Sequence, residues 1–319
     1  MLEVRDLSVE FDLGRRRPAL RALDDVSLTV APRETVGVVG ESGSGKSTLG
    51  RAILGLTQIS SGSVFFDGVE ITHADHRERQ RLSADLQVVF QDPYSSLNPT
   101  RTVGQTLRET LRVHRSEQTE DQINARVTAM LGRVGLPADA AERYPAHFSG
   151  GQRQRIAIAR ALMVQPRLVV CDEPMSALDL SVQAQALNLL RELQDEFQLS
   201  YLFIAHDLAV VRHLSHRIVV LYRGRIMEQG LASTVHGRPL HPYTRMLLDS
   251  APVPDPAQQR RRRGSSKRQP IARAAPSDGC PFAPRCPFAI DRCWSERPTL
   301  ERARSGTLVA CHRWRELES

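Results

Sequence analysis

The sequence predicts an α/β fold, and three observations lead to that prediction. A short apolar, β-branched stretch at residues 35–39 runs into a glycine-rich loop and then into a helical pattern. A second apolar stretch, at residues 168–172, ends in two acidic side chains. Further apolar strands follow at 201–205 and 217–222, separated by helical segments. Apolar strands that alternate with helices are typical of a buried, mostly parallel sheet.

Length and composition indicate a globular protein with more than one domain. The chain has 319 residues, of which 41% are apolar and 25% charged, as is ordinary for a globular protein. Residues 1–6 show no apolar signal region, and no run of about 18 apolar residues occurs. We therefore expect a cytoplasmic chain that does not span a membrane by itself but can dock on a membrane protein.

The net charge of +7 is concentrated in one place. Residues 260–268 carry six of the positive charges, beside prolines and serines. Such a run could contact nucleic acid or anionic lipid, but a solvated linker is the favoured interpretation.

Strand and helix signals follow one another along the chain. Residues 2–11 alternate between apolar and polar side chains, which predicts an edge strand. Gly and Pro signals separate it from three further strand candidates, at residues 26–30, 63–66 and 86–90. Helical spacing dominates from about 100 to 165 and returns at 181–197 and 207–214. Beyond about residue 230 the chain is rich in Pro, Arg and Cys, which marks an appended region.

The loop after residues 35–39 fits the phosphate-binding pattern G-x-x-x-x-G-K-[ST]. Glycines let such a loop wrap closely, so that backbone N–H groups and a helix N-terminus face phosphate oxygens. Lys46 can reach the β- and γ-phosphates, and the Ser47 hydroxyl can join a Mg²⁺ shell. A ligand-free turn is disfavoured by this strand–loop–helix context. The expected nucleotide ligands are Gly40, Glu41, Ser42, Gly43, Ser44, Gly45, Lys46, Ser47 and Thr48.

Two carboxylates end the apolar strand at residues 168–172. An acid at the end of a buried strand beside a phosphate loop is placed to hold Mg²⁺, which predicts that role for Asp172. Glu173, one residue further on, could polarise the water that attacks the γ-phosphate. A pair of surface acids is the alternative, and the phosphate loop makes it the weaker one.

A second anion receptor is predicted before another helix. Ser149, Gly150, Gly151 and Gln152 precede the helical residues 153–162, so they offer a bare helix N-terminus and a serine hydroxyl. Because one chain needs only one receptor for its own γ-phosphate, two chains or domains would sandwich the nucleotide. A simple N-capped helix is an equally good interpretation of this segment alone.

From about residue 2 to residue 230 the chain resembles the ATPase subunit of ABC transporters. Six motifs of that family occur in order: the phosphate loop, a glutamine loop, the signature, the strand with Asp-Glu, a D-loop and a switch histidine. The resemblance implies that Gln91 senses Mg²⁺ and contacts the membrane partner, and that His206 holds the γ-phosphate. It implies that Asp179 belongs to the D-loop at the dimer interface and that Phe11 stacks on adenine.

This resemblance also implies the architecture. We expect a P-loop NTPase core of the ABC ATPase type, with an antiparallel β subdomain, a helical subdomain and a small cysteine-containing C-terminal region. The expected boundaries are 1–91 and 160–230 for the core, 92–159 for the helical subdomain and 231–319 for the C-terminal region. Phe148 replaces the usual signature leucine and Met175 a common threonine, but neither change removes a catalytic group.

Three short segments are similar to the oligopeptide/dipeptide/nickel importer subfamily: residues 91–99, 180–185 and 241–244. The similarity implies an ATPase at the cytoplasmic face of the membrane that powers import of small peptides, with nickel or other solutes as alternatives. Its implied partners are two permease chains, a substrate-binding protein and a second ATPase, identical or sister. A soluble ABC ATPase acting on nucleic acid is a weaker alternative, and a P-loop kinase leaves the signature unexplained.

Four cysteines follow in the C-terminal region with the spacing C-x5-C-x6-C-x17-C. A cytoplasmic location disfavours disulfides, so Cys280, Cys286, Cys293 and Cys311 are candidate metal ligands. A [4Fe–4S] cluster is favoured, because the spacing lacks the CxxC pairs of zinc sites and resembles the tail of some peptide-importer ATPases. Zn²⁺ and unmetallated thiols are the alternatives. Cys171 lies in an apolar strand and is expected in the core.

Overall fold

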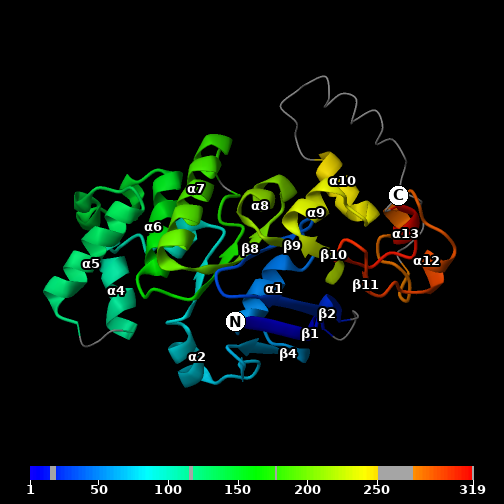
Figure 1. Cartoon of the computed structure of the whole chain (residues 1–319). Helices are drawn as coiled ribbons and strands as arrows, with labels where there is room; N and C mark the ends of the chain where they lie inside the picture. Colours follow the sequence, from blue (N-terminus) through cyan, green and yellow to red (C-terminus); the bar gives the residue numbers. More distant parts are fainter. Residues whose placement is uncertain (15–18, 115–117, 177, 251–275, 318–319) are drawn as a thin grey trace.

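The computed structural model describes residues 1–14, 19–114, 118–176, 178–250 and 276–317 (Figure 1). The arginine-rich run at 260–268 lies outside the described residues, so both of its interpretations stay predictions.

An eight-stranded sheet forms the centre of the molecule, in the order β11-β12-β10-β9-β3-β8-β7-β6. The strands from β9 to β6 pair in parallel, whereas β10 pairs antiparallel with β9. Every residue of β3, β7 and β8 is buried, which explains their continuous apolar sequence. The strand bounds are β3 Thr35–Val39, β6 Leu86–Val89, β7 Leu168–Asp172, β8 Ser200–Ala205, β9 Arg217–Tyr222, β10 Arg225–Leu231, β11 Glu301–Arg302 and β12 Leu308–Val309.

A second, antiparallel sheet has the order β2-β1-β4-β5, with β1 at Leu2–Phe11, β2 at Leu20–Val30, β4 at Ser61–Phe66 and β5 at Val69–Glu70. The predicted edge position of β1 is wrong, because β1 pairs with β2 on one side and with β4 on the other. Alternation of apolar and polar residues indicates that one face of a strand is covered. It does not indicate whether the strand pairs with one or with two neighbouring strands. The covered face packs on α1 (Lys46–Ile53) and on the central strands.

The helical part lies at one end of the molecule, on the side away from the C-terminus (Figure 1). Its helices share an apolar core that includes Val103, Leu107 and Leu131. They are α3 Pro93–Ser96, α4 Val103–His114, α5 Glu120–Arg133 and α6 Gly150–Leu162. Two 3₁₀ turns, Ala138–Glu142 and Pro145–His147, lie between α5 and α6. Elsewhere in the first 214 residues the structure describes the helices α2 His76–Leu82, α7 Leu180–Phe197 and α8 Leu208–Leu214.

The C-terminal elements extend the central sheet at its other end. The helices α9 (Ala232–Gly237) and α10 (Pro242–Ser250) follow β10, and β12 pairs antiparallel with β10. Phe282 is 1% exposed and belongs to the main core. The remaining short helices are a 3₁₀ turn at Ala283–Arg285, α12 at Arg292–Ser295 and α13 at Trp314–Leu317. The region therefore shares a sheet and a core with the rest of the chain.

Candidate nucleotide-binding site

The loop between β3 and α1 is wrapped around the side chain of its own lysine. The Lys46 ammonium donates hydrogen bonds to the backbone oxygens of Gly40 (2.8 Å) and Glu41 (3.0 Å). Gly45 has a φ of 103°, and a Cβ there would lie 2.5 Å from the Ala22 oxygen of β2. Only glycine fits this position, because the backbone is left-handed and the second sheet approaches closely.

Lys46 also faces the acid at the end of β7. Its Nζ lies 3.5 Å from Glu173 Oε1, and its side chain is only 4% exposed. Burial lowers the pKa of Lys46, whereas the charge of Glu173 raises it. An incoming phosphate would compete with Glu173 for this buried ammonium.

Ser47 and Asp172, which are 125 positions apart, meet at the same edge of the sheet. The Ser47 hydroxyl donates a hydrogen bond of 2.7 Å to Asp172 Oδ1. Burial raises the pKa of Asp172, and the Ser47 hydrogen bond offsets this effect only in part. A hydroxyl and a carboxylate oxygen side by side are the donor set that Mg²⁺ takes in phosphate sites, so these residues fit the predicted ion.

Glu173 and His206 face each other across the ends of β7 and β8. His206 Nδ1 lies 3.6 Å from Glu173 Oε2, and the histidine side chain is 59% exposed. Both line a cavity of about 160 Å³ together with Met175, Ser176 and Gln183. The structure thus brings Lys46, Ser47, Asp172, Glu173 and His206 into one site.

Two other predicted ligands follow from the ends of strands. Gln91 is exposed two residues after β6, the strand that pairs with β7. Phe11 ends β1 opposite Leu20 and is 40% exposed.

The signature and D-loop residues serve as helix caps within this chain. The Ser149 hydroxyl accepts a hydrogen bond from the backbone N–H of Gln152, and the Gln152 side-chain oxygen accepts one from the Ser149 N–H. Asp179 caps α7 by accepting the N–H of Val182 at 2.9 Å. Among the residues that the structure describes, no hydrogen bond or ion pair joins residues 149–152 to the phosphate loop.

Several contacts to the phosphate loop were not foreseen from the sequence. The Glu41 carboxylate pairs with Arg285, and the Glu41 N–H donates to the Tyr243 hydroxyl. The Ser44 hydroxyl is buried and has no hydrogen-bond partner among the described residues, so it is free to bind a phosphate oxygen. Tyr243 belongs to the predicted segment 241–244, but no local signal connects Arg285 with the loop.

The four C-terminal cysteines line one small cavity, together with Phe282 and His241, and all are free thiols. Burial raises the pKa of Cys280 to about 12 and that of Cys286 to about 11. In the described part of the chain, no three His, Cys, Asp or Glu side chains are grouped so that they could hold a metal ion. The iron–sulfur prediction therefore gains no support from the geometry. Cys171 is fully buried, in agreement with its predicted core position.

No helix among the described residues is both long and apolar enough to cross a membrane.

Comparison with known proteins agrees with this geometry. The ABC transporter family matches residues 23–176, and the oligopeptide/dipeptide transporter C-terminal region matches residues 227–293. The chain is 45% identical to the oligopeptide transport ATP-binding protein OppF of Salmonella typhimurium, over 94% of this chain and 92% of that protein. It is also 45% identical to OppF of Escherichia coli, over 94% and 92% of the two chains.

Solved structures give the same result for the fold. The ATP-binding cassette MJ0796, solved as a dimer bound to ADP and Pi, superimposes with a TM-score of 0.66 at 28% identity. That alignment covers 73% of this chain and 99% of MJ0796. The protein cbiO1 of Clostridium perfringens, part of the ABC transporter complex cbiONQ, aligns with a TM-score of 0.66 at 28% identity. That alignment covers 74% of this chain and 90% of cbiO1. The predicted ABC ATPase fold is confirmed, and the chain belongs to the ATP-hydrolysing, ATP-binding proteins of ABC transporters that carry the oligopeptide/dipeptide transporter C-terminal region.

Proposed function

We propose that this chain hydrolyses ATP to power the import of small peptides through a membrane permease. The observation that carries the proposal is the combination of a nucleotide site with 45% identity to oligopeptide transport ATP-binding proteins over 94% of the chain. The match of residues 227–293 to the oligopeptide/dipeptide transporter region favours peptides over nickel as cargo. It also disfavours the nucleic-acid and kinase alternatives.

The assembly is inferred from what one chain lacks. Among the described residues, 149–152 make no hydrogen bond to the chain's own phosphate loop, so we infer a second ATPase, identical or sister, that presents these residues and Asp179 to this site. We infer that two permease chains form the cargo path, because the chain matches the oligopeptide/dipeptide transporter C-terminal region. The ATPase would sit at the cytoplasmic face of the membrane, and a substrate-binding protein would deliver the peptide. The boundaries 1–91 and 160–230, 92–159 and 231–319 are proposed for the three parts.

We propose the following roles for the site residues. Ser47 and Asp172 would hold Mg²⁺, which when bound neutralises phosphate charge, and Gln91, which follows the strand β6 paired with β7, would be a further ligand. Lys46 leaves Glu173 for the β- and γ-phosphates as ATP enters. Glu173, released from Lys46, accepts a proton from the attacking water, and His206 holds the γ-phosphate. Closure of the two ATPases is tighter with ATP than with ADP, which lets hydrolysis drive the permease.

Replacing Glu173 by Gln tests the proposed base. Phosphate release is expected to fall about 100-fold or more, because an amide cannot accept the water proton. Binding of Mg-ATP should be retained or strengthened, because the phosphate no longer competes with the Glu173 charge, 3.5 Å away, for the Lys46 ammonium. Phosphate release and ATP titration measure the two effects, and Glu192→Gln, an exposed carboxylate of α7, is the matched control. Full activity of Glu173→Gln would show that another group is the base.

Asp172→Asn separates metal binding from folding. Burial raises the pKa of Asp172 in the folded protein above the value of about 3.9 that a carboxyl group has in the unfolded chain. The free energy of unfolding therefore falls as pH rises above that value, in comparison with a variant that lacks this carboxyl group. At pH 7 the amide removes this cost and still accepts the Ser47 hydrogen bond. The nucleotide-free variant should therefore unfold at the same or a higher urea concentration, and less of this difference should remain at pH 4.

The same variant should lose Mg²⁺-dependent ATP hydrolysis by about 100-fold or more, because it lacks a charged ligand for the ion. Glu192→Gln, at an exposed position in the interior of α7, should change neither property. A variant that loses stability in parallel with activity would contradict the metal role.

Peptide uptake tests the transport proposal. A strain that lacks this chain should lose ATP-dependent uptake of a radiolabelled dipeptide and regain it with the wild-type chain but not with Glu173→Gln. Uptake of a free amino acid serves as the control. Loss of ⁶³Ni²⁺ uptake with unchanged dipeptide uptake would assign the nickel alternative instead.

The cysteine region keeps its iron–sulfur cluster as a proposal. Four free thiols around one cavity match a four-cysteine ligand set in residue type, but their spacing in the structure is not that of a metal site. Iron, sulfide and zinc contents of protein purified without oxygen test it. The cluster requires about four irons and four sulfides per chain; one zinc per chain, or no metal, would contradict it.

A further inference from the structure

Glu41 of the phosphate loop is held by two residues that follow it by about 200 positions or more. Both guanidinium branches of Arg285 donate to the Glu41 carboxylate, at 2.6 and 2.8 Å. The Tyr243 hydroxyl accepts the Glu41 N–H at 2.8 Å. Both residues lie beyond the part of the chain, residues 23–176, that matches the ABC transporter family. The loop is therefore held from outside the core that builds the nucleotide site.

Packing fixes the place of the guanidinium. Arg285 ends a 3₁₀ turn that begins next to Phe282, and Phe282 is almost fully buried. The Phe282 ring contacts the rings of Tyr222 and Tyr243, with 5.4 Å between centroids in each pair. The Arg285 guanidinium lies 5.8 Å from the Phe282 ring centre and 5.9 Å from that of Tyr222. Arg285 thus reaches Glu41 from a rigid aromatic base.

Buried polar groups fix Tyr243 in turn. Glu228, fully buried on β10, accepts the backbone N–H groups of Leu240 and His241, at 2.9 Å each. The Nδ1 atom of His241 accepts the Tyr243 N–H at 3.0 Å. The segment 241–244 therefore fixes a hydroxyl against the phosphate loop, which gives this motif a structural role.

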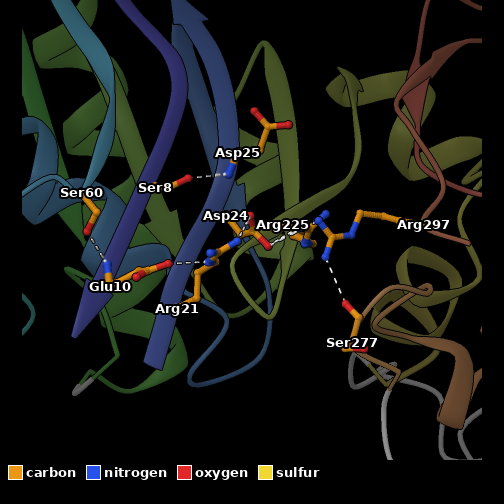
Figure 2. A network of polar contacts seen from close by, with 9 residues as sticks. All are labelled: Ser8, Glu10, Arg21, Asp24, Asp25, Ser60, Arg225, Ser277 and Arg297. Atoms are coloured by element: carbon orange, nitrogen blue, oxygen red, sulfur yellow. Dashed lines mark hydrogen bonds and ion pairs between the residues drawn. The ribbon is translucent and has the colours of Figure 1, made fainter. Parts of the chain in front are cut away.

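A second set of contacts links the same region to the loop. We call residues 276–317 the cysteine segment. Its Arg297 lies 3.8 Å from Asp24, which also pairs with Arg225 (Figure 2). Asp24 N–H donates to Gly224 O at 2.9 Å, and Gly224 N–H donates to Ser44 O at 2.8 Å. The cysteine segment is thus connected to both Glu41 and Ser44 of the loop.

The charge of Glu41 makes the Arg285 contact important for an anionic ligand. A phosphate loop attracts anions through its N–H groups and its lysine, so a free carboxylate within it would repel the triphosphate. The hydrogen bonds from Arg285 lower the pKa of Glu41, so the carboxylate, 38% exposed, is ionised beside the loop and its charge is best offset by a cation in contact with it. Arg285 is that partner, and its two-branched geometry also fixes the direction of the carboxylate.

We propose that Arg285 is a positioning residue for ATP binding: it neutralises Glu41 and holds the carboxylate against the cysteine segment, which leaves the loop open to phosphate. The inference rests on ATP binding by this chain and is independent of the cargo. Failure of peptide uptake would therefore leave it intact.

Calorimetric titration of the full chain with Mg²⁺ and AMP-PNP tests the proposal. Arg285→Ala should raise the dissociation constant by about fivefold or more, because the Glu41 charge is left uncompensated. Adding Glu41→Gln to that variant should return the constant to within about twofold of wild type, because the charge to be neutralised is gone. In ATPase assays KM should follow the same pattern while kcat stays within about twofold. Arg292→Ala, which breaks an ion pair inside the cysteine segment, is the matched control and should change nothing.

Two results would overturn the proposal. One is wild-type affinity in Arg285→Ala. The other is weakened binding that Glu41→Gln does not restore, because Arg285 would then act only through the fold of the cysteine segment. If Arg285→Ala fails to fold, Arg285→Lys and the single variant Glu41→Gln decide. The lysine variant should weaken binding less than fivefold, and Glu41→Gln should bind AMP-PNP at least as tightly as wild type; weaker binding by Glu41→Gln would contradict the account.

Discussion

The parallel pairing of β7, β8 and β3 is the constraint on which the site depends. Because these strands run in the same direction, their carboxyl ends reach one edge of the sheet, with Asp172 beside Ile204 and Val39 beside Ala205. The phosphate loop leaves this edge and turns back over it. Residues far apart in the sequence therefore meet at this edge: Ser47 with Asp172, and Lys46 with Glu173. Reversal of any one strand would remove its carboxylate or its loop from the edge.

The free protein stores unfavourable electrostatics at this edge, and nucleotide binding would relieve it. Asp172 is buried with a raised pKa, Lys46 is buried with a lowered pKa, and the structure describes no hydrogen-bond partner for the Ser44 hydroxyl. Mg²⁺ and phosphate supply the missing charges and acceptors, so binding and stability are coupled. Glu41 is the exception, because its charge opposes the ligand and is neutralised from the C-terminal side by Arg285. The C-terminal elements thus contribute a charge to the phosphate loop, and they also add strands to the central sheet.

Much of this arrangement could be predicted, because it is encoded in short segments. The loop, the apolar strand that ends in Asp172 and the helix after Ser149 each carry a local signal, and the parallel sheet follows from continuous apolar strands. The position of β1 could not be predicted, since alternation does not distinguish an interior strand from an edge strand. The contact of Arg285 with Glu41 spans 244 positions and has no local pattern. Ser149 illustrates a different limit: a cap and an anion receptor require the same residues, and only a second chain separates the two roles.

The central claim is that this ATPase works on a membrane permease, and its partners test that claim most directly. The measurement is purification of the tagged full-length chain from gently solubilised native membranes without oxygen, followed by mass spectrometry of every co-purifying chain. The account predicts two permease chains and a second ATPase, together with a substrate-binding protein that identifies the cargo. Recovery only from the soluble fraction, alone or with nucleic acid, would contradict it and leave an ATPase without a transport role.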